Sequence, residues 1–66
     1  MNLFKQKIDN LLTDLHKTIK ENENDIIVMQ NILKSDPNFS VNIDQIKSTN
    51  ESLKNLIHEL KMLSKY

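Results

Sequence analysis

The chain lacks several residue types, and each absence excludes a class of structure. It has no cysteine, which excludes disulfide bonds and thiolate metal sites. It has no glycine either, which excludes glycine-rich phosphate-binding loops. A single proline, Pro37, and few aromatic residues argue against a sheet protein. The lack of cysteine fits a reducing compartment, so we expect a cytoplasmic protein.

Positive and negative charges balance in this chain. Nine lysines balance nine acidic residues, and arginine is absent. A near-neutral chain is a poor general binder of polyanions, because that affinity comes from phosphate neutralisation. A dimeric RNA-binding hairpin is the alternative, with lysines aligned along either helix: Lys5, Lys17 and Lys20, or Lys47, Lys54 and Lys61. Acidic residues interleave both rows, which favours a solvated face of mixed charge over a nucleic-acid site.

The chain has 66 residues and forms one domain at most. Below roughly 70–80 residues a single core seldom supplies more than about 3–5 kcal/mol. Without disulfides or a metal, association with a second subunit is the remaining source of stability. We expect no membrane span and no signal peptide, since no long apolar run occurs. Abundant asparagine, lysine and isoleucine with no glycine, alanine or arginine are typical of AT-rich coding, as in low-GC bacteria, their phages and plasmids, or some eukaryotic parasites.

Residues 3 to about 34 are predicted to form one long helix, because apolar residues recur there at helical spacing. They fall within an arc of about 100°: Phe4, Ile8, Leu11, Leu12, Leu15, Ile19, Ile26, Met29 and Leu33. Asn22 is the one polar residue in that arc. Residues 20–25 are polar throughout, which leaves two interpretations, a solvated helical turn or a kink. We favour the solvated turn.

The predicted linker, residues 35–41, surrounds Pro37, because the residue before a proline avoids the α region. We expect Phe39 to pack against the helix ends. The second helix, about 42–64, has Asn42 as its cap and Gln45 three residues later. Thr49 and Asn50 interrupt its predicted buried face, which consists of Ile43, Ile46, Leu53, Leu56, Ile57, Leu60 and Leu63.

These elements predict an all-α fold, an antiparallel two-helix hairpin that dimerises into a four-helix bundle. The first helix is the longer one, so we expect Phe4 and Ile8 to overhang the second. Residues 26–33 are apolar around most of the helix, and two helices cannot hide all of that surface. The residues expected at the partner interface are Phe4, Ile8, Leu12, Ile19, Ile27, Val28, Ile32, Leu56 and Leu63.

No pattern in the chain predicts catalysis, a cofactor or a metal. His16 and His58 are the only histidines, and neither has a second ligand at the spacing that makes a helical metal site. The segment that starts at His58 begins like the zinc-protease motif H-E-x-x-H, but Met62 occupies its last position.

Within residues 46–57, the segment Asn50-Glu51-Ser52-Leu53-Lys54 resembles the S-Q-E-L-D hallmark of the Spo-zero-E type of small aspartyl-phosphate phosphatases. Those proteins are helical hairpins of similar size. Lys54 stands where that family has its essential aspartate, so the resemblance implies a hairpin regulator without phosphatase activity. Taken together, the sequence favours a non-enzymatic interaction module that acts as an adaptor, inhibitor or regulator, contacting itself and another protein.

Overall fold

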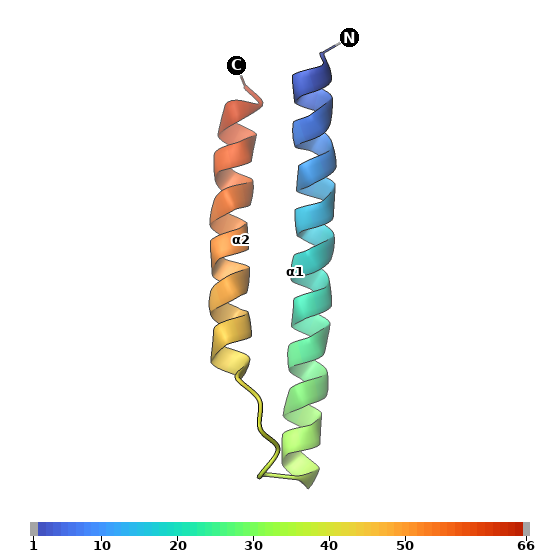
Figure 1. Ribbon diagram of the computed structural model, residues 1–66, viewed down its shortest axis with the longest axis vertical. Coiled ribbons are helices and arrows are strands. Elements are labelled where there is room, and N and C mark those ends of the chain that lie inside the picture. The colour runs from blue at the N-terminus through green and yellow to red at the C-terminus, as the bar shows by residue number, and fades with distance from the viewer. Residues whose placement is uncertain (1, 66) are drawn as a thin grey trace.

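The computed structural model describes residues 2–65, which form two antiparallel helices side by side (Figure 1). Helix α1 spans Leu3–Ser35 and helix α2 spans Ile43–Leu63. The predicted all-α hairpin is confirmed. Helix α1 continues through residues 20–25 without a break, as expected for a solvated helical turn.

Local capping accounts for where each helix begins. The Asn2 side chain accepts a hydrogen bond from the Lys5 backbone N–H at 3.1 Å. The predicted cap of α2 is confirmed, because Asn42 Oδ1 accepts from the Gln45 backbone N–H at 3.0 Å. Each bond satisfies one of the donors that the first helical turn leaves free. Asp44 in the first turn of α2 also complements the helix dipole.

The linker begins where Pro37 ends α1. Asp36 Oδ1 accepts the Asn38 N–H at 3.2 Å, and the Asp36 carbonyl accepts the Phe39 N–H at 3.0 Å. The chain then runs beside the last turns of α1 before α2 begins (Figure 1). Phe39, which was expected to pack against the helix ends, remains 38% exposed.

The course of the linker corrects the predicted overhang. Ile8 is only 3% exposed and is therefore covered within the hairpin. The linker, not α2, lies beside the last turns of α1, so α2 is displaced toward the N-terminal end of α1 (Figure 1). The prediction that Ile8 overhangs is wrong because it assumed that α2 starts opposite the last turn of α1. Phe4, one turn earlier, is exposed.

The covered side chains of both helices follow a strict alternation of three and four residues, the spacing of a coiled-coil seam. We call them the interhelical core. In α1 they are Ile8, Leu12, Leu15, Ile19, Asn22, Ile26, Met29 and Leu33. In α2 and its cap they are Ile43, Ile46, Asn50, Leu53, Ile57, Leu60 and Ser64.

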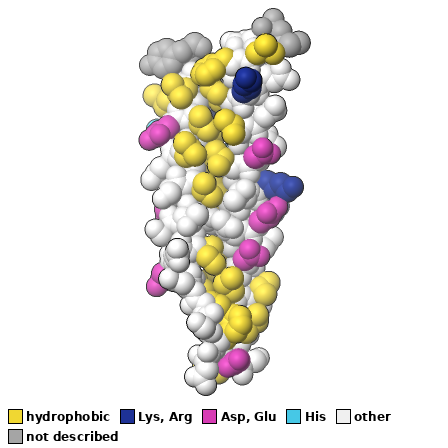
Figure 2. All heavy atoms as spheres, viewed as in Figure 1, with side chains coloured by type: hydrophobic (Ala, Val, Ile, Leu, Met, Phe, Trp, Pro, Cys, Tyr) yellow, Lys and Arg dark blue, Asp and Glu magenta, His cyan; other side chains and the backbone are white. Residues whose placement is uncertain are grey.

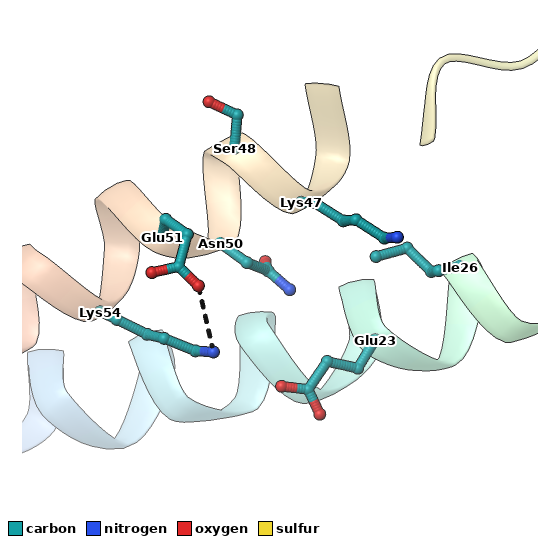
Figure 3. A pocket seen from close by; sticks show the side chains of 7 residues that line it. All are labelled: Glu23, Ile26, Lys47, Ser48, Asn50, Glu51 and Lys54. Atoms are coloured by element: carbon teal, nitrogen blue, oxygen red, sulfur yellow. Dashed lines mark ion pairs between the residues drawn. The ribbon is translucent and has the colours of Figure 1, made fainter. Parts of the chain in front are cut away.

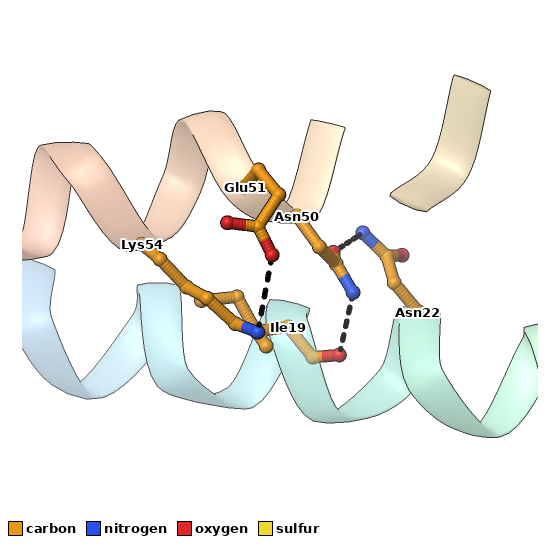
Figure 4. A network of polar contacts seen from close by, with 5 residues as sticks. All are labelled: Ile19, Asn22, Asn50, Glu51 and Lys54. Carbon is orange, nitrogen blue, oxygen red and sulfur yellow. Dashed lines mark hydrogen bonds and ion pairs between the residues drawn. The ribbon is translucent and has the colours of Figure 1, made fainter. Parts of the chain in front are cut away.

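A pair of asparagines lies in the middle of this core (Figure 4). Asn22 Nδ2 donates to Asn50 Oδ1 at 2.8 Å, and Asn50 Nδ2 donates to the Ile19 carbonyl at 3.4 Å. Asn50 is 4% exposed, so it belongs to the buried face of α2 and does not interrupt it, contrary to the sequence prediction. Within residues 2–65, no buried side-chain nitrogen or oxygen lacks a partner.

Candidate interaction surface

The alternating spacing gives the hairpin two different sides. In heptad notation, seven successive positions are labelled a to g, and core residues occupy the a and d positions. Asn22 occupies a d position of α1, and Asn50 occupies an a position of α2. The e and g positions flank the core of each helix. Because α1 and α2 are antiparallel, their g positions lie on one side of the hairpin and their e positions lie on the other.

The side formed by the g positions is rich in large apolar residues. We call its five exposed hydrophobic side chains the apolar face; they are 38–59% exposed. They are Phe4, Leu11 and Ile32 from α1, and Leu56 and Leu63 from α2. The other g positions of the two helices are Thr18, Asp25 and Thr49. Figure 2 shows a band of hydrophobic side chains along the junction of the helices, interrupted near mid-length and flanked by carboxylates.

Seven of the nine predicted interface residues separate into two groups. Phe4, Ile32, Leu56 and Leu63 lie on the apolar face, whereas Ile8, Leu12 and Ile19 lie in the interhelical core. The latter three side chains pack between α1 and α2 of one hairpin because they continue the a and d spacing. Contact of these three residues with a partner stays a prediction.

Leu11 was missed as a surface residue, although the spacing could have identified it. It was grouped with its neighbour Leu12 in the apolar arc of α1. The series Ile8, Leu12, Leu15, Ile19 leaves Leu11 at a g position, and it is 50% exposed. A strict heptad assignment would therefore have placed Leu11 beside the core and not within it.

Ile27 and Val28 form an apolar spot on the outer surface of α1. Both are 56% exposed. They occupy b and c positions away from α2, and Val28 lies one turn before Ile32. Two helices were expected to leave part of the apolar run at residues 26–33 uncovered, and only Ile26 of that run is buried. Contact of Ile27 and Val28 with a partner stays a prediction.

The opposite side of the hairpin is polar and carries an open hollow of about 380 Å³ (Figure 3). Its lining mixes charges of both signs: Glu23, Ile26, Lys47, Ser48, Asn50, Glu51 and Lys54. The Lys54 ammonium lies 3.6 Å from a Glu51 carboxylate oxygen, and both side chains are largely exposed. An exposed pair of this kind contributes little to stability. Lys47, Lys54 and Lys61 all occupy e positions, so they form a row along this side.

The two histidines lie on different helices, His16 on α1 and His58 on α2. Counting from the Asn22–Asn50 pair with equal rise in both helices, His58 lies level with Asp14 and His16 lies level with Leu56. Both imidazoles are exposed. Within residues 2–65, no group of three or more histidine, aspartate or glutamate side chains could hold a metal ion.

Comparison with family models, with curated proteins and with solved structures finds no match for this chain. Neither α1 nor α2 is long and apolar enough to cross a membrane.

Proposed function

We propose that this chain is a non-enzymatic protein–protein interaction module that works through its apolar face. The observation that carries the proposal is the clustering of five exposed large apolar side chains on one side of the hairpin. Soluble proteins seldom expose several large apolar side chains clustered on one side unless a partner covers them. In this proposal the hairpin dimerises into a four-helix bundle and acts as an adaptor, inhibitor or regulator of another protein.

The small core of the isolated hairpin supports a need for a partner. Within residues 2–65, the buried apolar side chains are only Ile8, Ile19, Ile26 and Ile57. Fully burying one exposed leucine, isoleucine or phenylalanine contributes about 1.5–3 kcal/mol. The side chains of the apolar face are about half exposed, so covering each adds roughly 1 kcal/mol before the cost of association. That gain is comparable to the stability expected of so short a chain.

In this proposal the outer spot formed by Ile27 and Val28 contacts the second protein. Val28 borders the apolar face because it lies one turn before Ile32, whereas Ile27 lies on the other side of Val28, farther from that face. Self-association through the apolar face therefore leaves Ile27 open, and exposed apolar surface outside the self-association contact suits an adaptor, which must hold itself together and engage a partner at the same time.

Nucleic-acid binding is a weaker second candidate. The observation that favours it is the row of Lys47, Lys54 and Lys61 on the side opposite the apolar face. Asp9 and Glu23 occupy e positions of α1 on that same side, and Glu51 pairs with Lys54. A row neutralised in this way offers little net attraction for phosphates.

A matched pair of variants tests the proposed function. Leu56→Glu places a charge on the apolar face, whereas Asn55→Glu places the same charge on the neighbouring outer position of α2. We expect Leu56→Glu to reduce helicity at micromolar concentration and to shift the sedimenting species toward 7.8 kDa, the mass of one chain. Asn55→Glu should leave both properties unchanged. If Leu56→Glu behaves like Asn55→Glu, the apolar face has no role in association.

A further inference from the structure

The apolar face is uneven along its length, and this restricts what can cover it. Counting from the Asn22–Asn50 pair, Leu63 and Leu56 lie level with residues 9 and 16 of α1. They therefore lie near Leu11. The apolar face thus has most of its large side chains at the end of the hairpin where α1 begins and α2 ends; Figure 1 shows these two helix ends side by side.

The middle of the face is polar. Thr49 lies level with residue 23 of α1, within two residues of Asp25 and next to the Asn22–Asn50 pair. Thr18, Asp25 and Thr49 are all exposed. A covering surface must therefore be apolar at one end and tolerate polar groups, including one carboxylate, halfway along.

The size of the face fits a second copy of the chain. The hairpin measures 53 × 16 Å across its broad side, so one face covers about 850 Å². Stable interfaces bury about 800 Å² from each partner. Two hairpins that overlap along their whole length meet this requirement, whereas two that overlap only at the apolar end cover about half of it.

Two full-length arrangements with two-fold symmetry are available. An axis parallel to the helices keeps both hairpins pointing the same way and sets α1 of one copy against α2 of the other. An axis across the helices reverses one hairpin and sets α1 against α1. The second arrangement brings Asp25 of one copy near Leu11 of the other, which buries a carboxylate against apolar side chains at a high cost.

The axis parallel to the helices places similar parts of the two apolar faces against each other. The most apolar end of each copy meets the same end of the other, and Asp25 faces the Thr49 hydroxyl of the second copy. All adjacent helices of the resulting bundle are antiparallel, the usual topology of a four-helix bundle with short loops. A closed two-fold contact also leaves no apolar face free to recruit further copies.

We propose that a second copy of this chain covers the apolar face, related by a two-fold axis parallel to the helices. Each α1 then packs against its own α2 through the interhelical core and against the α2 of the other copy through the apolar face. This arrangement rests on the proposed function and specifies which helices meet.

Disulfide trapping tests the arrangement cleanly because the natural chain has no cysteine. Asp25→Cys and Thr49→Cys are made on separate chains, which are mixed, unfolded, refolded together and oxidised. The two thiols then meet only between copies. We expect a covalent Asp25→Cys/Thr49→Cys heterodimer, since the two positions lie nearly level on facing helices. Thr18→Cys alone is the matched control, because in this arrangement the two copies of α1 lie on a diagonal and do not cross-link.

The outcomes separate the arrangement from the proposed function. A Thr18→Cys homodimer that forms more readily than the mixed heterodimer overturns the parallel axis and leaves self-association intact. A dimeric wild-type chain with no cross-link in the mixture also overturns the arrangement. A wild-type chain that sediments as a folded monomer overturns both proposals. Circular dichroism before oxidation establishes that each cysteine variant is as helical as the wild type.

Discussion

Asn22 donates a hydrogen bond of 2.8 Å to Asn50 across the interhelical core. Every other a or d position from Ile8 to Leu33 and from Ile43 to Leu60 is apolar. Replacing both partners of a buried polar pair with apolar residues is often neutral or stabilising, so this pair is weak support for stability. A single buried asparagine can instead fix the register of a coiled coil. We infer that the pair determines how far α2 is displaced along α1.

The first prediction concerns this pair. Asn22→Leu removes one partner and leaves the buried Asn50 carbonyl oxygen without its donor, so we expect a loss of about 1–3 kcal/mol in the free energy of unfolding. The control is Asn24→Leu on the outer surface of α1, which changes helix propensity by the same amount. Urea unfolding followed by circular dichroism measures both, and equal stabilities for the two variants would refute the role of the pair.

The double variant Asn22→Leu/Asn50→Leu is a separate test of register. It should recover the stability that Asn22→Leu loses, because no buried polar atom is left unpaired. With the polar pair gone, we expect α2 to occupy more than one register along α1. Amide NMR spectra should show duplicated or broadened signals for residues of α2. A single sharp set of signals at full stability would contradict the assigned role.

The capping of α2 gives a third prediction. Asn42→Ala removes the acceptor of the Gln45 N–H and should cost about 1 kcal/mol of unfolding free energy. Asn55→Ala in the middle of α2 is the matched control, since the Asn55 side chain is exposed. We expect the control to be neutral or slightly stabilising, because alanine is the better helix former. Thermal unfolding of both variants side by side decides whether the cap contributes.

Salt dependence gives a fourth prediction that separates the two functional candidates. In the proposed arrangement, Asp14 of one copy and Glu59 of the other flank the apolar face at nearly the same level, and their carboxylates repel. Added salt screens exposed charges over about 10 Å at 0.1 M, so it should strengthen self-association. Nucleic-acid binding would weaken steeply with salt.

Glu59→Gln tests that repulsion directly. It should lower the dimer dissociation constant by a few-fold and remove part of its salt dependence, since isolated surface charges are each worth about 0.2–1 kcal/mol. Glu23→Gln is the control, because Glu23 lines the hollow on the opposite side. An equal effect of both substitutions would show that net charge, and not the position of Glu59, controls association.

The hairpin could be predicted from the sequence because its determinants are local. Asn42 and Gln45 identify the start of α2, and Pro37 identifies the end of α1, without knowledge of any distant contact. The continuous apolar spacing of α1 predicted one helix across residues 20–25 because a polar turn on a solvated surface does not disrupt a helix.

The register of the helices could not be predicted in the same way. It depends on the path of the linker and on the contact between Asn22 and Asn50, which are far apart in the chain. The sequence analysis treated Asn50 as an interruption because a polar residue is normally exposed unless it is paired. With Asn22 opposite Asn50, α2 extends far enough along α1 to cover Ile8.

The composition of the apolar face was predicted in part. Leu56 and Leu63 were expected to exceed what a two-helix contact can bury, and both are more than 40% exposed. Ile8 and Ile19 were assigned to the partner although they lie in the interhelical core, because an apolar arc alone does not separate a and d positions from their g neighbours.

Sedimentation equilibrium of the wild-type chain over a range of micromolar concentrations tests the central claim most directly. The account predicts a helical species of twice the 7.8 kDa chain mass that dissociates on dilution, with loss of helicity as the apolar face becomes exposed. A fully helical species of 7.8 kDa at every concentration would contradict it.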